Sequence, residues 1–197
     1  MVMHSTLSWA DLAGRRVGIY GIGLEGRSSL KACRARGIAP VIVDDRPTVA
    51  VVDGVKVTAT GDGGLDLLLG CDVVIKSPGI SHYSNHLDQL HRNGVEIVSG
   101  LGMWMQGADR ERVLCVGGTK GKSTTSALLA HLVRSAGLNC YLGGNIGDAP
   151  FDPDVSPEFD YWVIEVGSYQ SVDFGVTSPH VAITSLGEDH LDWHRND

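Results

Sequence analysis

Short apolar runs recur along the chain, each followed by a glycine-containing turn and often by a stretch with helical spacing. The clearest helical stretch is 122–136, where Leu128 and Leu132, like Leu129 and Val133, stand four residues apart. The pattern predicts helices at 24–36, 86–92 and 122–136, and strands at 17–20, 40–43, 49–57, 72–76, 95–98, 113–116, 140–142, 161–166 and 181–185. A turn rich in Gly and Asp follows 49–57. Strands that alternate with helices predict an α/β fold with parallel sheets.

One segment, 101–112, interrupts this rhythm. It is predicted to form a short amphipathic helix and a polar turn, after which the order strand, glycine loop and helix begins again. A chain of 197 residues can hold two domains of about 100 residues each. We therefore expect a first domain at 1–100 and a second domain at 101–197.

Composition excludes several classes of protein. The formal net charge of −7 and the lack of a basic stretch argue against nucleic-acid binding. The N-terminus does not resemble a secretory signal, and no apolar run approaches the ~20 residues of a membrane span. Four widely spaced cysteines form no C-x-x-C pair, which argues against a disulfide scaffold or a zinc knuckle. These features favour a cytoplasmic protein.

The first glycine loop, GIGLEG, follows the strand at 17–20 and places Gly21, Gly23 and Gly26 in a G-x-G-x-x-G motif. Such a loop holds a diphosphate at a helix N-terminus. Asp44 closes the next strand, where dinucleotide enzymes place an acid for ribose hydroxyls, although a polar strand end is also common. By itself this loop is compatible with an NAD-dependent oxidoreductase.

The second glycine loop, VGGTKGKSTT, is the most informative stretch of the chain. It joins a strand to a helix and places Lys122 and Ser123 at the helix start, as in a phosphate-binding P-loop. The full P-loop pattern has glycine where Val116 stands, so this is a shortened form. The simpler alternative is a glycine-rich helix cap.

Seven short motifs, in a fixed order along the chain, give it a family resemblance. The segments GTKGKSTT, GGNIG, VIEVGSYQ and SLGEDHLDWH, with GIGLEGRSS, VDDR and SPGI before them, resemble the Mur ligases of bacterial cell-wall synthesis. The resemblance implies a Rossmann-like UDP-binding domain followed by part of a P-loop-type ATPase domain. It also implies an enzyme that uses ATP and Mg²⁺ to form an amide bond through an acyl phosphate.

Within that family, the first domain looks most like the members that add glutamate to UDP-N-acetylmuramoyl-L-alanine in peptidoglycan synthesis. D-glutamate is the expected substrate. An L-glutamate-adding relative and a non-catalytic fragment that binds UDP-sugar or nucleotide are the alternatives. We expect the full-length protein to be a monomer without membrane or nucleic-acid partners.

The resemblance also assigns residues to two binding sites. The predicted contacts to the UDP substrate are Gly23, Leu24, Glu25, Asp44, Asp45, Arg46, Ser77, Gly79 and Asn145. The predicted contacts to ATP are Gly118, Thr119, Lys120, Gly121, Lys122, Ser123 and Thr124. By this resemblance the G-x-G-x-x-G loop faces the diphosphate of a UDP-sugar and not NAD.

The predicted catalytic residues are Lys122, Glu165 and His190. Glu165 ends a buried strand, where a carboxylate lies beside a nucleotide and is a hard ligand for Mg²⁺. The predicted metal ligands are Ser123, Thr124, Glu165 and His190. His190 and His194 stand four residues apart, which on a helix would also suit zinc, but the resemblance assigns Mg²⁺ to His190.

The chain departs from the family pattern in two places. Gly167-Ser168 stands where the glutamate-adding relatives usually have Ser-Ser. The chain ends at Asp197, before the carbamylated lysine and the C-terminal domain that the resemblance implies. We therefore expect these 197 residues to bind UDP-sugar but not to form an amide bond by themselves.

Overall fold

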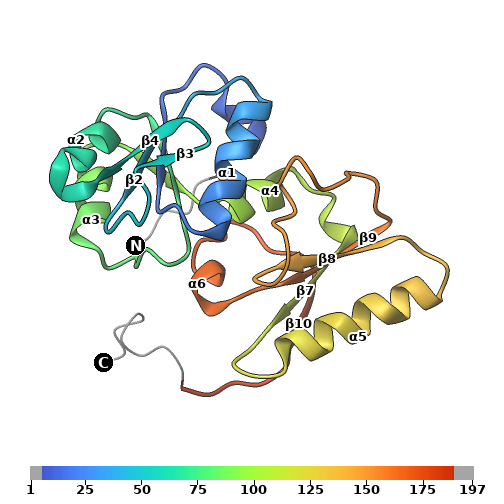
Figure 1. The fold of residues 1–197 in the computed structure, drawn as a ribbon. Helices are drawn as coiled ribbons and strands as arrows, with labels where there is room; N and C mark the ends of the chain where they lie inside the picture. The colour runs from blue at the N-terminus through green and yellow to red at the C-terminus, as the bar shows by residue number, and fades with distance from the viewer. Residues whose placement is uncertain (1–5, 189–197) are drawn as a thin grey trace.

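The protein has two mainly parallel sheets, each with helices packed on it. A computed structural model describes residues 6–188, and Figure 1 shows the two sheets side by side with α4 and α6 between them. The architecture is mixed α/β, which confirms the predicted fold class. In this described part of the chain, no helix is long and apolar enough to cross a membrane.

The first sheet has six strands in the order β3-β4-β2-β1-β5-β6, and only the β3–β4 pair is antiparallel. Its strands are β1 (Val17–Tyr20), β2 (Val41–Asp44), β3 (Val51–Val52), β4 (Val55–Ala59), β5 (Val73–Lys76) and β6 (Glu96–Val98). Its helices and short 3₁₀ turns are η1 (Trp9–Leu12), α1 (Leu24–Ala35), η2 (Thr60–Asp62), α2 (Gly64–Leu69), α3 (Asn85–Arg92) and α4 (Gly100–Gly107).

Both faces of this sheet are buried because successive side chains of a strand point to opposite sides. In β5, Val73 and Ile75 pack with α1, whereas Val74 packs with α2 and α3. Tyr20 at the end of β1 lies on the same side as Val74. Such strands therefore appear in the sequence as continuous apolar runs without polar alternation.

The second sheet has four parallel strands in the order β10-β7-β9-β8. Its elements are β7 (Val113–Gly117), α5 (Lys122–Ser135), β8 (Cys140–Gly144), β9 (Tyr161–Glu165), α6 (Ser168–Ser171) and β10 (His180–Ile183), after η3 (Arg110–Arg112). One face, with Val116 and Val163, packs on α5. The other face, with Cys115 and Ile164, joins the apolar cluster of the first sheet, so one core runs through both parts.

Several local expectations need correction. The segment predicted as one strand at 49–57 is a hairpin, because Asp53 and Gly54 both adopt positive φ and reverse the chain. The turn that follows contains the helix α2, and α6 was not predicted. In α5, Leu128 and Leu132 are exposed, whereas Leu129 and Val133 pack on the sheet. All four cysteines are free and buried.

Candidate functional site

The first phosphate loop lies at the carboxyl ends of β1 and β5, where the strand order reverses direction. Ligands of open α/β sheets bind at such a switch point. Gly21 N donates to Val43 O at 2.8 Å, and Ser77 Oγ donates to Gly21 O at 2.6 Å. A Cβ built on Gly26 would lie 2.1 Å from Gly21 O, so α1 contacts the loop backbone directly. These hydrogen bonds connect the loop after β1 to the ends of β2 and β5.

The open side of this loop is formed by Gly23, Leu24 and Gly79. No atom lies within 4 Å of a Cβ built on Gly23 or Gly79, and Leu24 is 70% exposed although it is apolar. Backbone N–H groups at the start of α1 favour an anion here, because the helix N-terminus carries partial positive charge. These three residues are therefore the accessible part of the loop.

Asp44 supports the loop through both of its carboxylate oxygens. It accepts hydrogen bonds from Ile22 N and Arg46 N, each at 2.9 Å. Asp45 accepts a hydrogen bond from Tyr20 Oη at 2.6 Å. Both Asp45 and Arg46 are exposed and lie just beyond the end of β2. The structure therefore gives Asp44 a supporting role in the loop, whereas Asp45 and Arg46 are accessible to a ligand.

Glu25 lies on the other side of α1 and faces the second sheet. Its carboxylate accepts hydrogen bonds from Gln170 Nε2 at 3.2 Å and from Leu101 N at 3.4 Å. Burial raises the pKa of Glu25 to about 7. The structure therefore places Glu25 in the contact between the two sheets, although the family resemblance suggested a UDP contact.

The second phosphate loop joins β7 to α5. Gly118 and Gly121 adopt positive φ, and Lys122 Nζ donates to Gly118 O at 2.8 Å and to Thr119 O at 3.1 Å. The lysine thus lies over the loop backbone, while Ser123 and Thr124 are exposed in the first turn of α5.

Residues after β10 hold this loop from one side. Lys120 N donates to Ser185 Oγ at 2.8 Å, and Thr184 Oγ1 donates to Lys120 O at 2.7 Å. Thr119 N donates to Ser185 O at 2.9 Å. These contacts give the shortened loop a defined conformation despite its missing glycine.

Glu165 and Asn145 lie at the carboxyl ends of β9 and beyond β8, next to the second loop. Glu165 pairs in register with Val116, which directly precedes the loop, and its side chain is 1% exposed. Asn145 Nδ2 donates to Glu165 Oε1 at 2.9 Å. Glu165 Oε2 is buried and has no hydrogen-bond partner among the described residues. A buried carboxylate oxygen without a partner is costly, and a cation would satisfy it.

This arrangement fits a divalent cation held by one carboxylate together with hydroxyl and phosphate oxygens. Within residues 6–188 no group of three or more His, Cys, Asp and Glu side chains is arranged to hold a metal. Mg²⁺ commonly binds through one or two carboxylates plus substrate phosphates, so a larger cluster is not required. The predicted ligand His190 lies outside the described residues.

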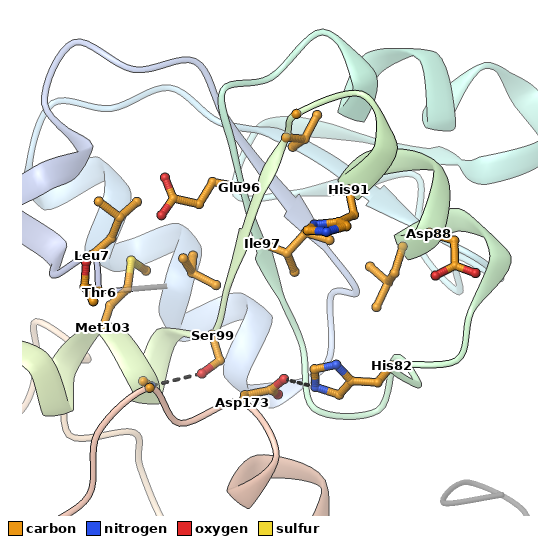
Figure 2. Close-up of a pocket in the computed structure, with 16 residues that line it drawn as sticks. Thr6, Leu7, His82, Asp88, His91, Glu96, Ile97, Ser99, Met103 and Asp173 are labelled. Atoms are coloured by element: carbon orange, nitrogen blue, oxygen red, sulfur yellow. Dashed lines mark hydrogen bonds and ion pairs between the residues drawn. The ribbon is translucent and has the colours of Figure 1, made fainter. Parts of the chain in front are cut away.

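A pocket of about 770 Å³ lies along β6, between α3, α4 and the segment around Asp173 (Figure 2). None of the residues predicted for the two phosphate loops lines it. Figure 2 shows His82 and Asp173 pointing toward each other at one end of the pocket.

Two buried charged side chains that connect the two sheets were not predicted from sequence. Lys76, at the end of β5, and Asp173, after α6, form a buried ion pair across the two sheets. The available sequence signal was a lysine that ends the apolar run VVIK immediately before Ser77-Pro78-Gly79. Its partner, 97 positions further along the chain, had no such signal.

Comparisons with known proteins agree with the two-part architecture. Residues 15–99 match the family described as Mur ligase MurD-like, N-terminal domain, and residues 116–197 match the Mur ligase middle domain. A curated relative from Salinispora tropica, UDP-N-acetylmuramoyl-L-alanine–L-glutamate ligase, is 40% identical over 94% of this chain and 42% of its own length. A relative of the same name from Xylella fastidiosa (strain Temecula1) is 38% identical over 93% of this chain and 42% of its own length. The chain thus spans about two fifths of the length of these relatives.

Solved structures show a similar fold at lower identity. The UDP-N-acetylmuramate:L-alanyl-γ-D-glutamyl-meso-diaminopimelate ligase from Neisseria meningitidis is 20% identical, with a TM-score of 0.52 over 92% of this chain and 63% of that chain. The UDP-N-acetylmuramate–alanine ligase from Thermotoga maritima is 20% identical, with a TM-score of 0.51 over 93% of this chain and 44% of that chain. At this identity the likeness concerns the fold.

Proposed function

The chain belongs to the Mur ligase family, and on that premise we propose that the whole protein is an ATP-dependent ligase that adds L-glutamate to UDP-N-acetylmuramoyl-L-alanine. The names of the relatives support L-glutamate, the alternative to the D-glutamate expected from sequence. The reaction belongs to the assembly of peptidoglycan precursors. We place it in the cytoplasm, where ATP and nucleotide sugars are available.

The observation that carries the proposal is the buried Oε2 of Glu165, which has no hydrogen-bond partner within residues 6–188 and lies beside a phosphate loop that ends in Lys122. A carboxylate is a poor acyl donor, so amide formation needs activation by phosphoryl transfer, which concentrates negative charge at one place. In this proposal Lys122 neutralises phosphate charge. Glu165, Ser123 and Thr124 are the residues that would hold Mg²⁺, and the ion would screen phosphate charge when bound.

The two phosphate loops have different tasks in this proposal. The loop with Gly23 and Leu24 binds the diphosphate of the UDP-sugar, with Asp45, Arg46, Ser77 and Gly79 around it. The loop at 118–124 binds ATP. Asn145 reaches toward the muramoyl part of the substrate and at the same time orients Glu165 through its hydrogen bond. The assignments of these residues, and the domain boundary near residue 100, are part of the proposal.

Binding measurements test this function on the chain as it is. Titration calorimetry should show that UDP-N-acetylmuramoyl-L-alanine and UDP bind more tightly than NAD. Lys122→Ala should weaken binding of a non-hydrolysable ATP analogue while UDP binds as before. Equal or tighter binding of NAD would contradict the assignment of the first loop. For the full-length protein, product mass with each glutamate enantiomer tests the choice of L-glutamate.

A further inference from the structure

The segment 167–173, which begins two residues after Glu165, contacts α1 and the end of β5 in the first sheet. Gln170, which is buried, donates from Nε2 to Glu25 Oε2 at 3.2 Å and accepts at Oε1 from Gly167 N at 2.9 Å. It therefore links Glu25 of α1, two residues after Gly23 of the first phosphate loop, to the backbone that leaves β9. One side chain spans the two halves of the protein.

A second contact reaches the same segment from β5. Lys76 Nζ lies 2.9 Å from Asp173 Oδ2, and both side chains are almost fully buried, at 0% and 4% exposed. His82 Nε2 lies 2.5 Å from the other Asp173 oxygen (Figure 2). Lys76 Nζ also donates to Ile80 O at 2.9 Å and to Ser77 O at 3.3 Å. Lys76 thus connects Asp173 to the Ser77–Ile80 turn that borders the first phosphate loop.

Gly167, at the start of this segment, is connected through Asn145 to Glu165, which lies beside the second loop. A Cβ built on Gly167 would lie 2.7 Å from Asn145 Oδ1, so Asn145 packs directly against the Gly167 backbone. Asn145 in turn donates to Glu165 Oε1. A displacement of the segment would therefore shift Asn145 and the carboxylate beside the second loop. Gly167, the departure from the usual Ser-Ser, is what permits this close contact.

Buried charges are an expensive way to join two sheets. Taking a lysine and an aspartate out of water carries a desolvation penalty, whereas burying apolar groups is favourable, and the attraction between the two charges repays that penalty only with good geometry. The apolar cluster shared by the two sheets already joins them. The ion pair additionally fixes the position of the segment 167–173 relative to β5. A charged contact at 2.9 Å is lost when the two groups move apart by a small distance, whereas apolar contacts are not directional.

We propose that Gln170 and Asp173 are positioning residues that couple UDP-sugar binding at the first loop to nucleotide binding at the second. The inference rests on the proposed function. A ligand that orders the Ser77–Ile80 turn and the start of α1 acts on Lys76 and Glu25. Through Asp173 and Gln170 it then biases the position of Glu165. By reciprocity, nucleotide binding must strengthen UDP-sugar binding by the same factor.

The test measures this factor on the 197-residue chain. Affinity for a non-hydrolysable ATP analogue with Mg²⁺ is determined with and without saturating UDP-N-acetylmuramoyl-L-alanine. We expect at least a 5-fold gain in the parent chain, which is the lower end of typical coupling. The double variant Lys76→Met/Asp173→Leu removes both buried charges and should bring the ratio to about 1. Gln170→Met keeps a side chain of similar size but loses both hydrogen bonds of Gln170, so it should also lower the ratio. This variant tests the inference if the double variant does not fold.

The matched control is Asp154→Asn. Asp154 pairs with Lys31 of α1 at 2.7 Å, which is also a contact between the two parts, but it touches neither loop and is exposed. This variant should keep the parent ratio. The inference is overturned if the parent shows no coupling, or if Lys76→Met/Asp173→Leu and Gln170→Met keep the parent ratio. It is also overturned if Asp154→Asn lowers the ratio as much as those two variants do. Failure of UDP-N-acetylmuramoyl-L-alanine to bind the parent at all would instead reject the proposed function.

Discussion

Replacing Gly26 by alanine should destabilise the protein, against the usual effect of this substitution in a helix. Gly26 lies in the first turn of α1, where alanine normally gains about 0.5–1 kcal/mol through helix propensity. Here the new Cβ would lie 2.1 Å from Gly21 O and 3.0 Å from Ser77 Oγ. Since ordinary contacts of a Cβ begin near 3.4 Å, the Gly21 carbonyl must move by more than 1 Å.

The size of the effect follows from the contacts that such a shift disturbs. Overpacking of this kind costs about 1–3 kcal/mol. The hydrogen bond from Ser77 Oγ to Gly21 O would weaken, which adds about 0.5–1.5 kcal/mol. After the propensity gain is subtracted, we expect Gly26→Ala to lower the free energy of unfolding by about 0.5–4 kcal/mol. Urea unfolding followed by far-UV circular dichroism measures this loss.

Gly23→Ala is the matched control in the same motif. Gly23 has a negative φ, and a Cβ there meets no atom within 4 Å. Its substitution should cost no more than about 1 kcal/mol of stability, from its position as helix N-cap. A methyl group on this open side should nevertheless lower affinity for UDP about tenfold or more, since it occupies the space that a diphosphate needs. If Gly26→Ala were as stable as Gly23→Ala, the close approach of α1 to Gly21 would not matter and the reasoning would be refuted.

Three further predictions concern charge and reactivity. Because the pKa of Glu25 is raised from 4.5 to about 7, its stabilising contribution is present below pH ~4.5 and lost as pH rises through ~7. Relative to the parent, Glu25→Gln should therefore gain at most about 3 kcal/mol in unfolding free energy between pH 5 and pH 8, and a parallel pH profile would contradict this. Lys122→Ala should weaken ATP-analogue binding by about 10- to 100-fold, from the loss of ~1.5–3 kcal/mol of a charged contact, and unchanged affinity in calorimetry would make the loop structural. Burial raises the pKa of Cys33 to about 12 and that of Cys115 to about 11, so a thiol reagent at pH 8 should label neither in the native protein and all four cysteines after denaturation.

The sequence alone was sufficient for the parts of this protein that depend on local pattern. Buried parallel strands such as β5 and β9 appear as continuous apolar runs, and each glycine loop marks a strand end followed by a helix start. The two loops, the positions of the main strands along the chain and Glu165 at a strand end could therefore be predicted. The hairpin of β3 and β4 was missed although Asp53-Gly54 is a recognisable turn, and α2 and α6 are too short to show a helical period.

Tertiary structure decided which way individual side chains face and which distant residues meet. Glu25 follows a phosphate loop in sequence, yet the rotation of α1 directs its carboxylate to Gln170 and Leu101. Leu128 and Leu129 are equally apolar neighbours, but only Leu129 packs on the second sheet. The pairing of Lys76 with Asp173 exists only because the two sheets share a core that brings β5 and the segment after α6 together. Local pattern specifies elements through backbone geometry, whereas such long-range pairs depend on how the elements pack, which no short stretch of sequence encodes.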